Sequence, residues 1–131
     1  MKKIRVIKIK PHEIPDAAYI YPTSEAFLTA VGGDYTNDGN AYLKKIDNNI
    51  YAVCPIIVDI LDIEGNRKID DKIICGTFCI TETDTKGKPV SMSDENFKKY
   101  VHRFFMPESY DYEDALESYY KTGYKIQVKD W

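Results

Sequence analysis

The side chains best suited to chemistry lie between positions 59 and 67, where the carboxylates of Asp59, Asp62 and Glu64 precede an amide and a guanidinium. A metal-assisted hydrolase would use Asp59, Asp62 and the Asn66-Arg67 pair. Such a reaction needs one carboxyl group to hold a proton near neutral pH, and no neighbouring residue explains how it would. Asn66 can adopt the left-handed turn conformation beside Gly65, and Arg67 can bind a carboxylate. We therefore expect a solvated strand and a structural turn, with the hydrolase as an alternative.

The two histidines, His12 and His102, are the only candidates of their type for acid–base chemistry near neutral pH. His102 is expected in water on the polar face of a helix. His12, together with Glu13 and Asp16, could form part of a divalent metal site. The turn-rich sequence around His12 favours an ordinary loop instead.

The three cysteines are predicted to be free thiols in the core. Cys75 and Cys79 are four residues apart on a predicted strand, which puts their side chains on one face about 13 Å apart. That separation is too large for one metal ion. A zinc site would need a bend in this strand, or Cys54 brought close together with a histidine. An odd number of cysteines without an export signal also favours a reducing compartment.

Complete catalytic signatures are missing from the chain, including Gly-x-Ser-x-Gly, Gly-Lys-Ser/Thr, Gly-x-Gly-x-x-Gly and His-Glu-x-x-His. The segment from Asp34 to Gly39 opens like a calcium loop, but its twelfth position is Lys45, where calcium needs a bidentate glutamate. We therefore expect a protein without catalytic residues, metal or cofactor. A divalent metal remains an alternative.

An acidic, tyrosine-rich segment near the C-terminus is the strongest candidate for partner binding. No lysine or arginine interrupts it between Arg103 and Lys121. Tyrosine offers a large contact area with few rotamers to restrict, while the acids attract a basic partner and disfavour wrong ones. A helix with buried tyrosines and solvated acids is the alternative interpretation. The predicted partner-binding residues are Tyr110, Asp111, Glu113, Asp114 and Glu117.

Composition limits the class of protein and of partner. The 131 residues, 44% of them apolar, are about the length of one domain, and the net charge is −3. Five of the first ten residues are Lys or Arg, whereas positions 11 to 43 contain none. A short basic arm beside acidic surface disfavours direct nucleic-acid binding. No apolar run approaches the roughly 20 residues of a membrane span, and no apolar signal region follows Met1, so a cytoplasmic location is expected.

Hydrophobic periodicity predicts an α+β fold, with an antiparallel or mixed sheet of about five or six strands and two or three helices packed on one side. In the first strand, Ile4 and Val6 alternate before the phase slips at Ile7 and Ile9, as at a bulge or in a strand covered on both faces. Capping residues and the i, i+3, i+4 spacing place helices at 24–31, 94–106 and 112–122. Strands are expected at 3–9, 42–46, 50–54, 56–63, 67–69, 73–81 and, at an edge, 124–128.

Four short motifs occur in a familiar order: 25–28 with 31–33, then 65–67, 73–80 and 91–100. Over residues 4 to 108 the chain resembles an uncharacterised family of small bacteriophage and conjugative-element proteins. The resemblance implies an accessory role in conflict with host defence, because relatives are found near antirestriction genes. We expect a single domain over 1–131, in which a core of 1–108 resembles the family and 109–131 forms a helix–strand extension.

Three hypotheses for function follow. The leading one is a non-enzymatic inhibitor that binds a basic host defence protein, a CRISPR effector or restriction enzyme, through acidic surface and blocks its engagement of nucleic acid. The second is the metal-assisted hydrolase that uses the region from Asp59 to Arg67. The third is a self-associating regulatory module in which the last strand pairs with a second copy. The protein is accordingly expected to be a monomer or a homodimer.

Overall fold

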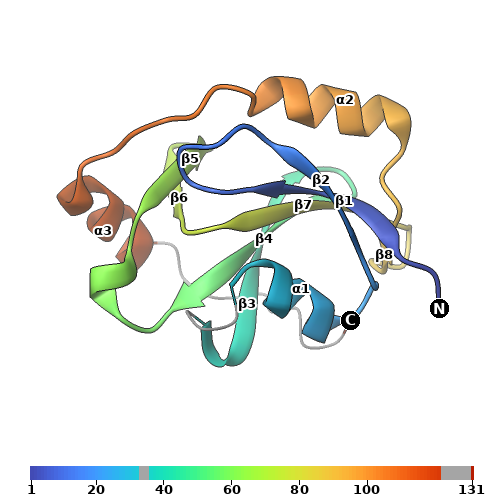
Figure 1. Ribbon diagram of the computed structural model, residues 1–131, viewed down its shortest axis with the longest axis horizontal. Helices are drawn as coiled ribbons and strands as arrows, with labels where there is room; N and C mark the ends of the chain where they lie inside the picture. Colours follow the sequence, from blue (N-terminus) through green and yellow to red (C-terminus); the bar gives the residue numbers. More distant parts are fainter. Residues whose placement is uncertain (33–35, 122–130) are drawn as a thin grey trace.

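The computed structural model describes the backbone of residues 1–32, 36–121 and 131, and the side chains of 1–32, 41–121 and 131. Its centre is a six-stranded antiparallel sheet, accompanied by a separate two-stranded hairpin and three α-helices (Figure 1). The predicted α+β class, with an antiparallel sheet and three helices, is confirmed. The main sheet has the order β2-β1-β7-β4-β3, with β8 paired to β7, and comprises β1 (Ile4–Ile9), β2 (Asp16–Ile20), β3 (Thr36–Asp47), β4 (Ile50–Ile57), β7 (Phe78–Thr83) and β8 (Pro89–Val90).

Strand β1 is covered on both faces, which explains its unusual apolar pattern. Its register with β2 is regular, so no bulge interrupts the strand. Ile4 and Val6 pack in one cluster, and Ile7 and Ile9 pack in another on the opposite face. The two apolar pairs therefore belong to two different cores.

The helices are divided between the two faces of the sheet, where a single covered face was predicted. The helix α1 (Ser24–Ala30) contributes Phe27 to the cluster that contains Val53 and Cys79. The helix α2 (Asp94–Arg103) contributes Tyr100 to the larger cluster on the other face. Because apolar side chains project from both faces of β1, β4 and β7, one helix layer could not bury them all.

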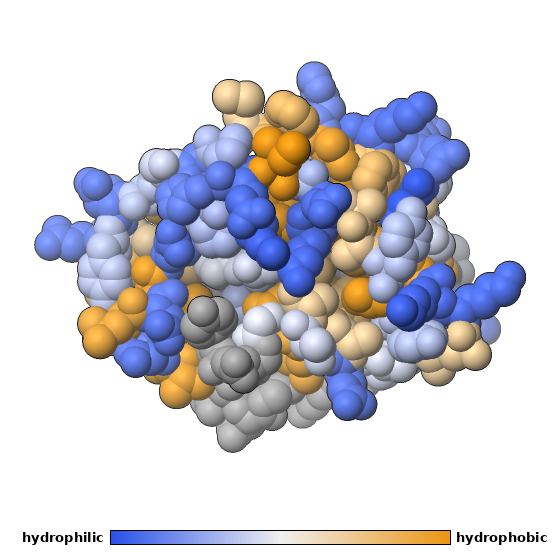
Figure 2. All heavy atoms as spheres, viewed as in Figure 1, coloured by the Kyte–Doolittle hydropathy of each residue, from blue (hydrophilic) through white to orange (hydrophobic). Residues whose placement is uncertain are grey.

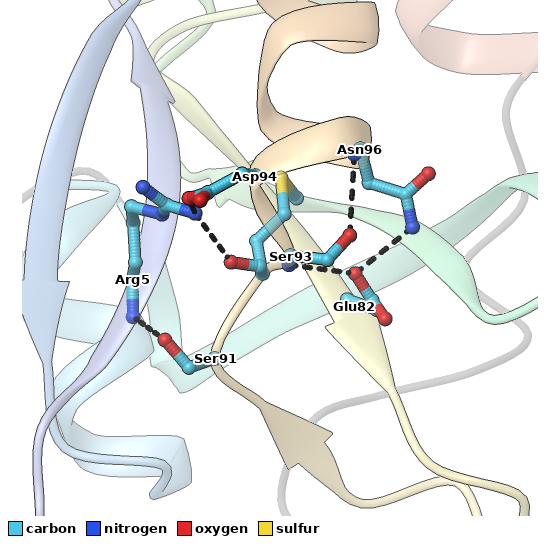
Figure 3. A network of polar contacts seen from close by, with 7 residues as sticks. Arg5, Glu82, Ser91, Ser93, Asp94 and Asn96 are labelled. Atoms are coloured by element: carbon cyan, nitrogen blue, oxygen red, sulfur yellow. Dashed lines mark hydrogen bonds and ion pairs between the residues drawn. The ribbon is translucent and has the colours of Figure 1, made fainter.

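One polar contact joins the start of α2 to the sheet, and a second caps the helix (Figure 3). The guanidinium of Arg5 donates to a carboxylate oxygen of Asp94 at 2.6 Å and lies over the ring of Phe97. The hydroxyl of Ser93 accepts the amide of Asn96 at 3.2 Å, as the predicted N-cap. The contacts of Arg5 hold the start of the helix against β1.

The predicted hairpin around residues 47–49 is confirmed as β3 and β4, with Asn49 in the left-handed conformation. The separate strand predicted at 56–63 is wrong. Strand β4 ends at Ile57 and is followed by a 3-10 helix, η2 (Ile60–Asp62), which is capped by the Asp59 carboxylate accepting the amide of Leu61 at 2.9 Å. A capping aspartate satisfies the backbone locally and so ends the strand.

The predicted strand at 73–81 is divided in two. β5 (Gly65–Ile69) and β6 (Lys72–Cys75) form the separate hairpin, and β7 begins only at Phe78. Gly76 between them has a φ of +78°, and the side chain of Pro55 lies 3.0 Å from where its Cβ would be. A left-handed backbone and this close approach favour glycine, which lets the chain turn from one sheet into the other.

The helix α3 (Tyr112–Lys121) packs on β6 and buries Ala115 and Tyr119. The hydroxyl of Tyr119 accepts the amide of Ile57 at 2.7 Å, which connects the helix to the end of β4. The predicted strand at 124–128 and the helix end at Gly123 lie outside the described residues.

Candidate functional site

Arg67 is completely buried and acts as a structural clamp. Its Nε donates to the carbonyl of Phe104 at 3.0 Å, Nη1 to Oδ1 of Asn66 at 2.8 Å, and Nη2 to the carbonyl of Glu13 at 2.7 Å. Burial lowers the pKa of Arg67, and the nearby carboxylate of Glu108 opposes that shift. The sequence led us to expect a carboxylate partner for Arg67, but its guanidinium donates to two backbone carbonyls and to the side chain of Asn66.

Asn66 extends the same network. Its amide nitrogen donates to the carbonyls of Ile9 at 2.9 Å and Gly76 at 2.8 Å. Asn66 lies in β5 and is not in the left-handed conformation that we predicted; Asp70 and Asp71 adopt it instead, in the turn between β5 and β6. Asn66 and Arg67 therefore have a structural role, as predicted. They do not form a turn, however; they join three distant segments of the chain by hydrogen bonds.

The residues proposed for hydrolysis do not share an accessible surface. Asp59 and Asp62 are exposed around η2, whereas Asn66 and Arg67 are fully buried and occupied by internal hydrogen bonds. A substrate in contact with the two carboxylates would not reach the buried pair.

The histidine and cysteine candidates are also separated. His12 pairs with Glu64 at 2.7 Å, and neither Glu13 nor Asp16 forms an ion pair with it among the described residues. Cys75 and Cys79 lie on strands of different sheets, so the predicted common face is wrong. Among the described residues, no three His, Cys, Asp or Glu side chains are arranged to hold a metal ion.

All three cysteines are buried free thiols, as predicted. Burial raises the pKa of Cys75 and of Cys79 to about 12, and it raises that of Cys54 as well. A thiolate is disfavoured where no water can solvate it. The segment 34–39, which opens like a calcium loop, lies outside the described side chains.

The predicted partner-binding residues lie on or just before α3 and differ in their exposure and contacts. Asp111, Glu113 and Asp114 are exposed, and no described residue forms an ion pair with them. Glu117 pairs with Lys121 at 2.7 Å, and this hydrogen bond lowers the pKa of its carboxyl group. Tyr110 is half-buried and its hydroxyl donates to the Glu108 carboxylate; burial, followed by that contact, raises the pKa of Tyr110 to about 12.

One side of α3 forms a groove of about 380 Å³ against the β5–β6 hairpin. Tyr110, Asp114 and Glu117 line it, so the structure brings these three predicted residues together. Lysines line the same groove, and its charged residues are balanced: Lys68, Lys72 and Lys121 with Asp71, Asp114 and Glu117. The groove therefore offers little net negative potential.

Apolar side chains of the η2 segment, and Tyr112 at the start of α3, are exposed to water. Val58, Ile60 and Leu61 are 61%, 46% and 81% exposed, and Tyr112 is 43% exposed. The hydroxyl of Tyr112 donates to the carbonyl of Ile60 at 2.9 Å, which places Tyr112 beside η2, and the four exposed residues are called here the η2–α3 patch. In Figure 2, hydrophobic side chains reach the surface among hydrophilic ones at the end of the molecule where Figure 1 places the segment between β4 and β5.

Exposed acids border the η2–α3 patch. Asp59 and Asp62 belong to the same turn, and Asp111 and Glu113 flank Tyr112 in the sequence. None of the four forms an ion pair with a described residue. An apolar centre with a charged border is typical of surfaces that bind other proteins.

The apolar residues of this patch were missed because Ile56 to Ile63 was interpreted as a strand. The available signal was the spacing of Asp59 and Asp62, which interrupts the alternation that a half-buried strand requires. An aspartate side chain also commonly accepts a hydrogen bond from the backbone amide two residues later, which forms a local turn.

The chain matches no protein-family model, curated protein or solved structure. Across the described residues, the helices are too short and too polar to cross a membrane. The chemistry of the η2–α3 patch and its acidic border is therefore the main guide to function.

Proposed function

We propose that this protein is a non-enzymatic inhibitor that binds a basic partner through the η2–α3 patch and the acids around it. Following the resemblance to phage and mobile-element proteins, the proposed partner is a host nucleic-acid-targeting defence protein, a CRISPR effector or a restriction enzyme. By covering a basic surface, the inhibitor would block engagement of nucleic acid.

One observation carries the proposal: four large apolar side chains are exposed together, and the acids beside them have no cationic partner among the described residues. Leu61 is the most exposed of the four, in a turn fixed by its capping aspartate. Burial of such side chains at an interface is favourable at about 25 cal/mol per Å² of apolar area.

The charges of this surface suit a nucleic-acid-binding protein. Exposed carboxylates attract lysine and arginine over roughly 10 Å at moderate salt, and they increase the rate of encounter. Asp111 and Glu113 should contribute more to partner binding than Asp114 and Glu117, because the latter pair shares a groove with three lysines that offset its negative charge.

The deciding experiment is capture of purified CRISPR and restriction effectors, with nucleic-acid binding by the captured effector as a second measurement. The double variant Asp111→Asn/Glu113→Gln should weaken capture more than Asp114→Asn/Glu117→Gln, which changes the charge equally. Leu61→Ser should weaken it at any salt concentration, whereas the effect of the acids should fade as salt rises.

Equal capture by the wild type and all three variants would refute the proposed surface. A complex that leaves nucleic-acid binding unchanged would refute the proposed mode of inhibition. Self-association that is removed by Leu61→Ser would favour the regulatory homodimer instead.

A further inference from the structure

A second candidate surface lies between β2 and α1, and it shares no residue with the η2–α3 patch. This groove of about 470 Å³ is lined by the small side chains Ala18, Ala26 and Ala30. The helix α1 has only seven residues, so it leaves part of the sheet face beside β2 uncovered. The volume lies within the usual range of ligand-binding pockets.

The groove reaches the free edge of the sheet. Strand β2 is the end of the strand order and pairs only with β1 among the described residues. Four consecutive residues, 18 to 21, line the groove. Successive side chains of a strand point to opposite faces, so a space lined by consecutive residues includes the backbone edge of that strand. Its outward-facing amides and carbonyls are therefore accessible to an added strand.

The charged residues of the groove favour an acidic ligand. Lys3 and Lys8 line it, and Glu25 is the acid that accompanies them. Lys8 is half-buried, and no carboxylate of the described residues forms an ion pair with either lysine. The Lys3 ammonium lies 5.4 Å from the centre of the Tyr21 ring, at the border of the groove.

We propose that the edge of β2 and this groove bind an extended peptide segment with alternating apolar and acidic residues. The peptide backbone would extend the sheet by hydrogen bonds to β2, in the manner of strand addition. Its apolar side chains would fill the space over Ala18 and Ala26, and an acidic side chain would pair with Lys8. The ligand is thus opposite in charge to the partner of the η2–α3 patch.

The test is selection of peptides from a random 12-residue display library on the immobilised full chain, followed by fluorescence polarisation with the selected peptides. We expect them to be enriched in Asp and Glu at alternate positions. The charge reversal Lys8→Glu should weaken binding at least about tenfold, and Lys8→Gln should weaken it less. Lys10→Glu is the matched control, because this exposed residue lies outside the groove.

A steric variant tests the position independently of charge. Thr29 is exposed on α1 and lines the groove, so Thr29→Trp should fill it without disturbing the core. Methylation of alternate peptide amides should also abolish binding, because it removes the hydrogen bonds to β2. The proposal is overturned if no peptide is selected, or if binding persists in Lys8→Glu and Thr29→Trp. Asp111→Asn/Glu113→Gln should leave peptide binding unchanged, so this result is separable from the proposed inhibition.

Discussion

The hydroxyl of Tyr112 donates a hydrogen bond to the carbonyl of Ile60 at 2.9 Å, which joins the first turn of α3 to η2 across 52 positions of sequence. This contact joins the two halves of the η2–α3 patch. The hydroxyl of Tyr119 also accepts the amide of Ile57 at 2.7 Å, so a partner would meet a surface held by two contacts between α3 and the segment at the end of β4.

Removal of this contact should loosen the turn more than it destabilises the fold. In Tyr112→Phe we expect the unfolding free energy to fall by about 1 kcal/mol or less, because the hydrogen bond is solvent-accessible. Amide hydrogen exchange at residues 60–63 should accelerate. Tyr120→Phe is the control, since this exposed hydroxyl has no hydrogen bond among the described residues. Unchanged exchange in Tyr112→Phe would show that the contact does not fix the turn.

Replacement of Arg67 should be far more damaging. Arg67→Met would leave the carbonyl of Phe104 and Oδ1 of Asn66 without this donor in buried surroundings, and each buried unsatisfied group costs about 1–3 kcal/mol. We expect a loss of at least about 3 kcal/mol in urea unfolding. Lys68→Met, at the exposed neighbouring position, should change stability little. A similar midpoint for both variants would contradict the clamp.

The ion pair between Arg5 and Asp94 predicts a pH dependence. The hydrogen bond from Arg5 lowers the pKa of the Asp94 carboxyl below its usual 3.8. A lowered pKa in the folded state stabilises the protein above the unfolded-state value, and this contribution disappears as pH falls through the folded value. Asp94→Asn should therefore be less stable than wild type at pH 7, and the two should converge below pH 3.8. Glu95→Gln controls for the loss of a first-turn acid; a constant gap at all pH values would argue against the pair.

The buried thiols should be unreactive until the protein unfolds. Because burial raises the pKa of Cys75 and Cys79 to about 12, little thiolate is present at pH 8. A thiol-specific chromogenic disulfide should label the native protein slowly, and should label all three cysteines in denaturant. Fast labelling of one thiol in the native protein would show that its site opens locally.

The regular elements could be predicted because their signals are local. Ser93 and the apolar spacing after it locate α2, and the polar turn at 47–49 locates the β3–β4 hairpin. The division of 73–81 was missed because its cause is not local. Gly76 turns the chain at a contact with Pro55, a residue 21 positions earlier, and no periodicity reveals that approach.

The candidate site was predicted in part. Acidic residues are usually exposed to solvent, so their exposure can be predicted from the sequence, and Asp111 and Glu113 are exposed as expected. How many cations lie near each acid depends on tertiary neighbours: two of the three lysines that share a groove with Asp114 and Glu117 come from the β5–β6 hairpin. Burial of Arg67 was likewise unpredictable, because its partners are backbone carbonyls, which every sequence contains.

The position of β7 in the sheet has a consequence for biosynthesis. β7 pairs with both β1 and β4, so it alone joins the β1–β2 hairpin to the β3–β4 hairpin. A nascent chain that has emerged from the ribosome only as far as residue 75 holds the β1–β2 and β3–β4 hairpins of the main sheet with no ladder between them. Commitment to the native topology must therefore wait for residues 78–83, and until then the apolar faces of both hairpins are available to chaperones.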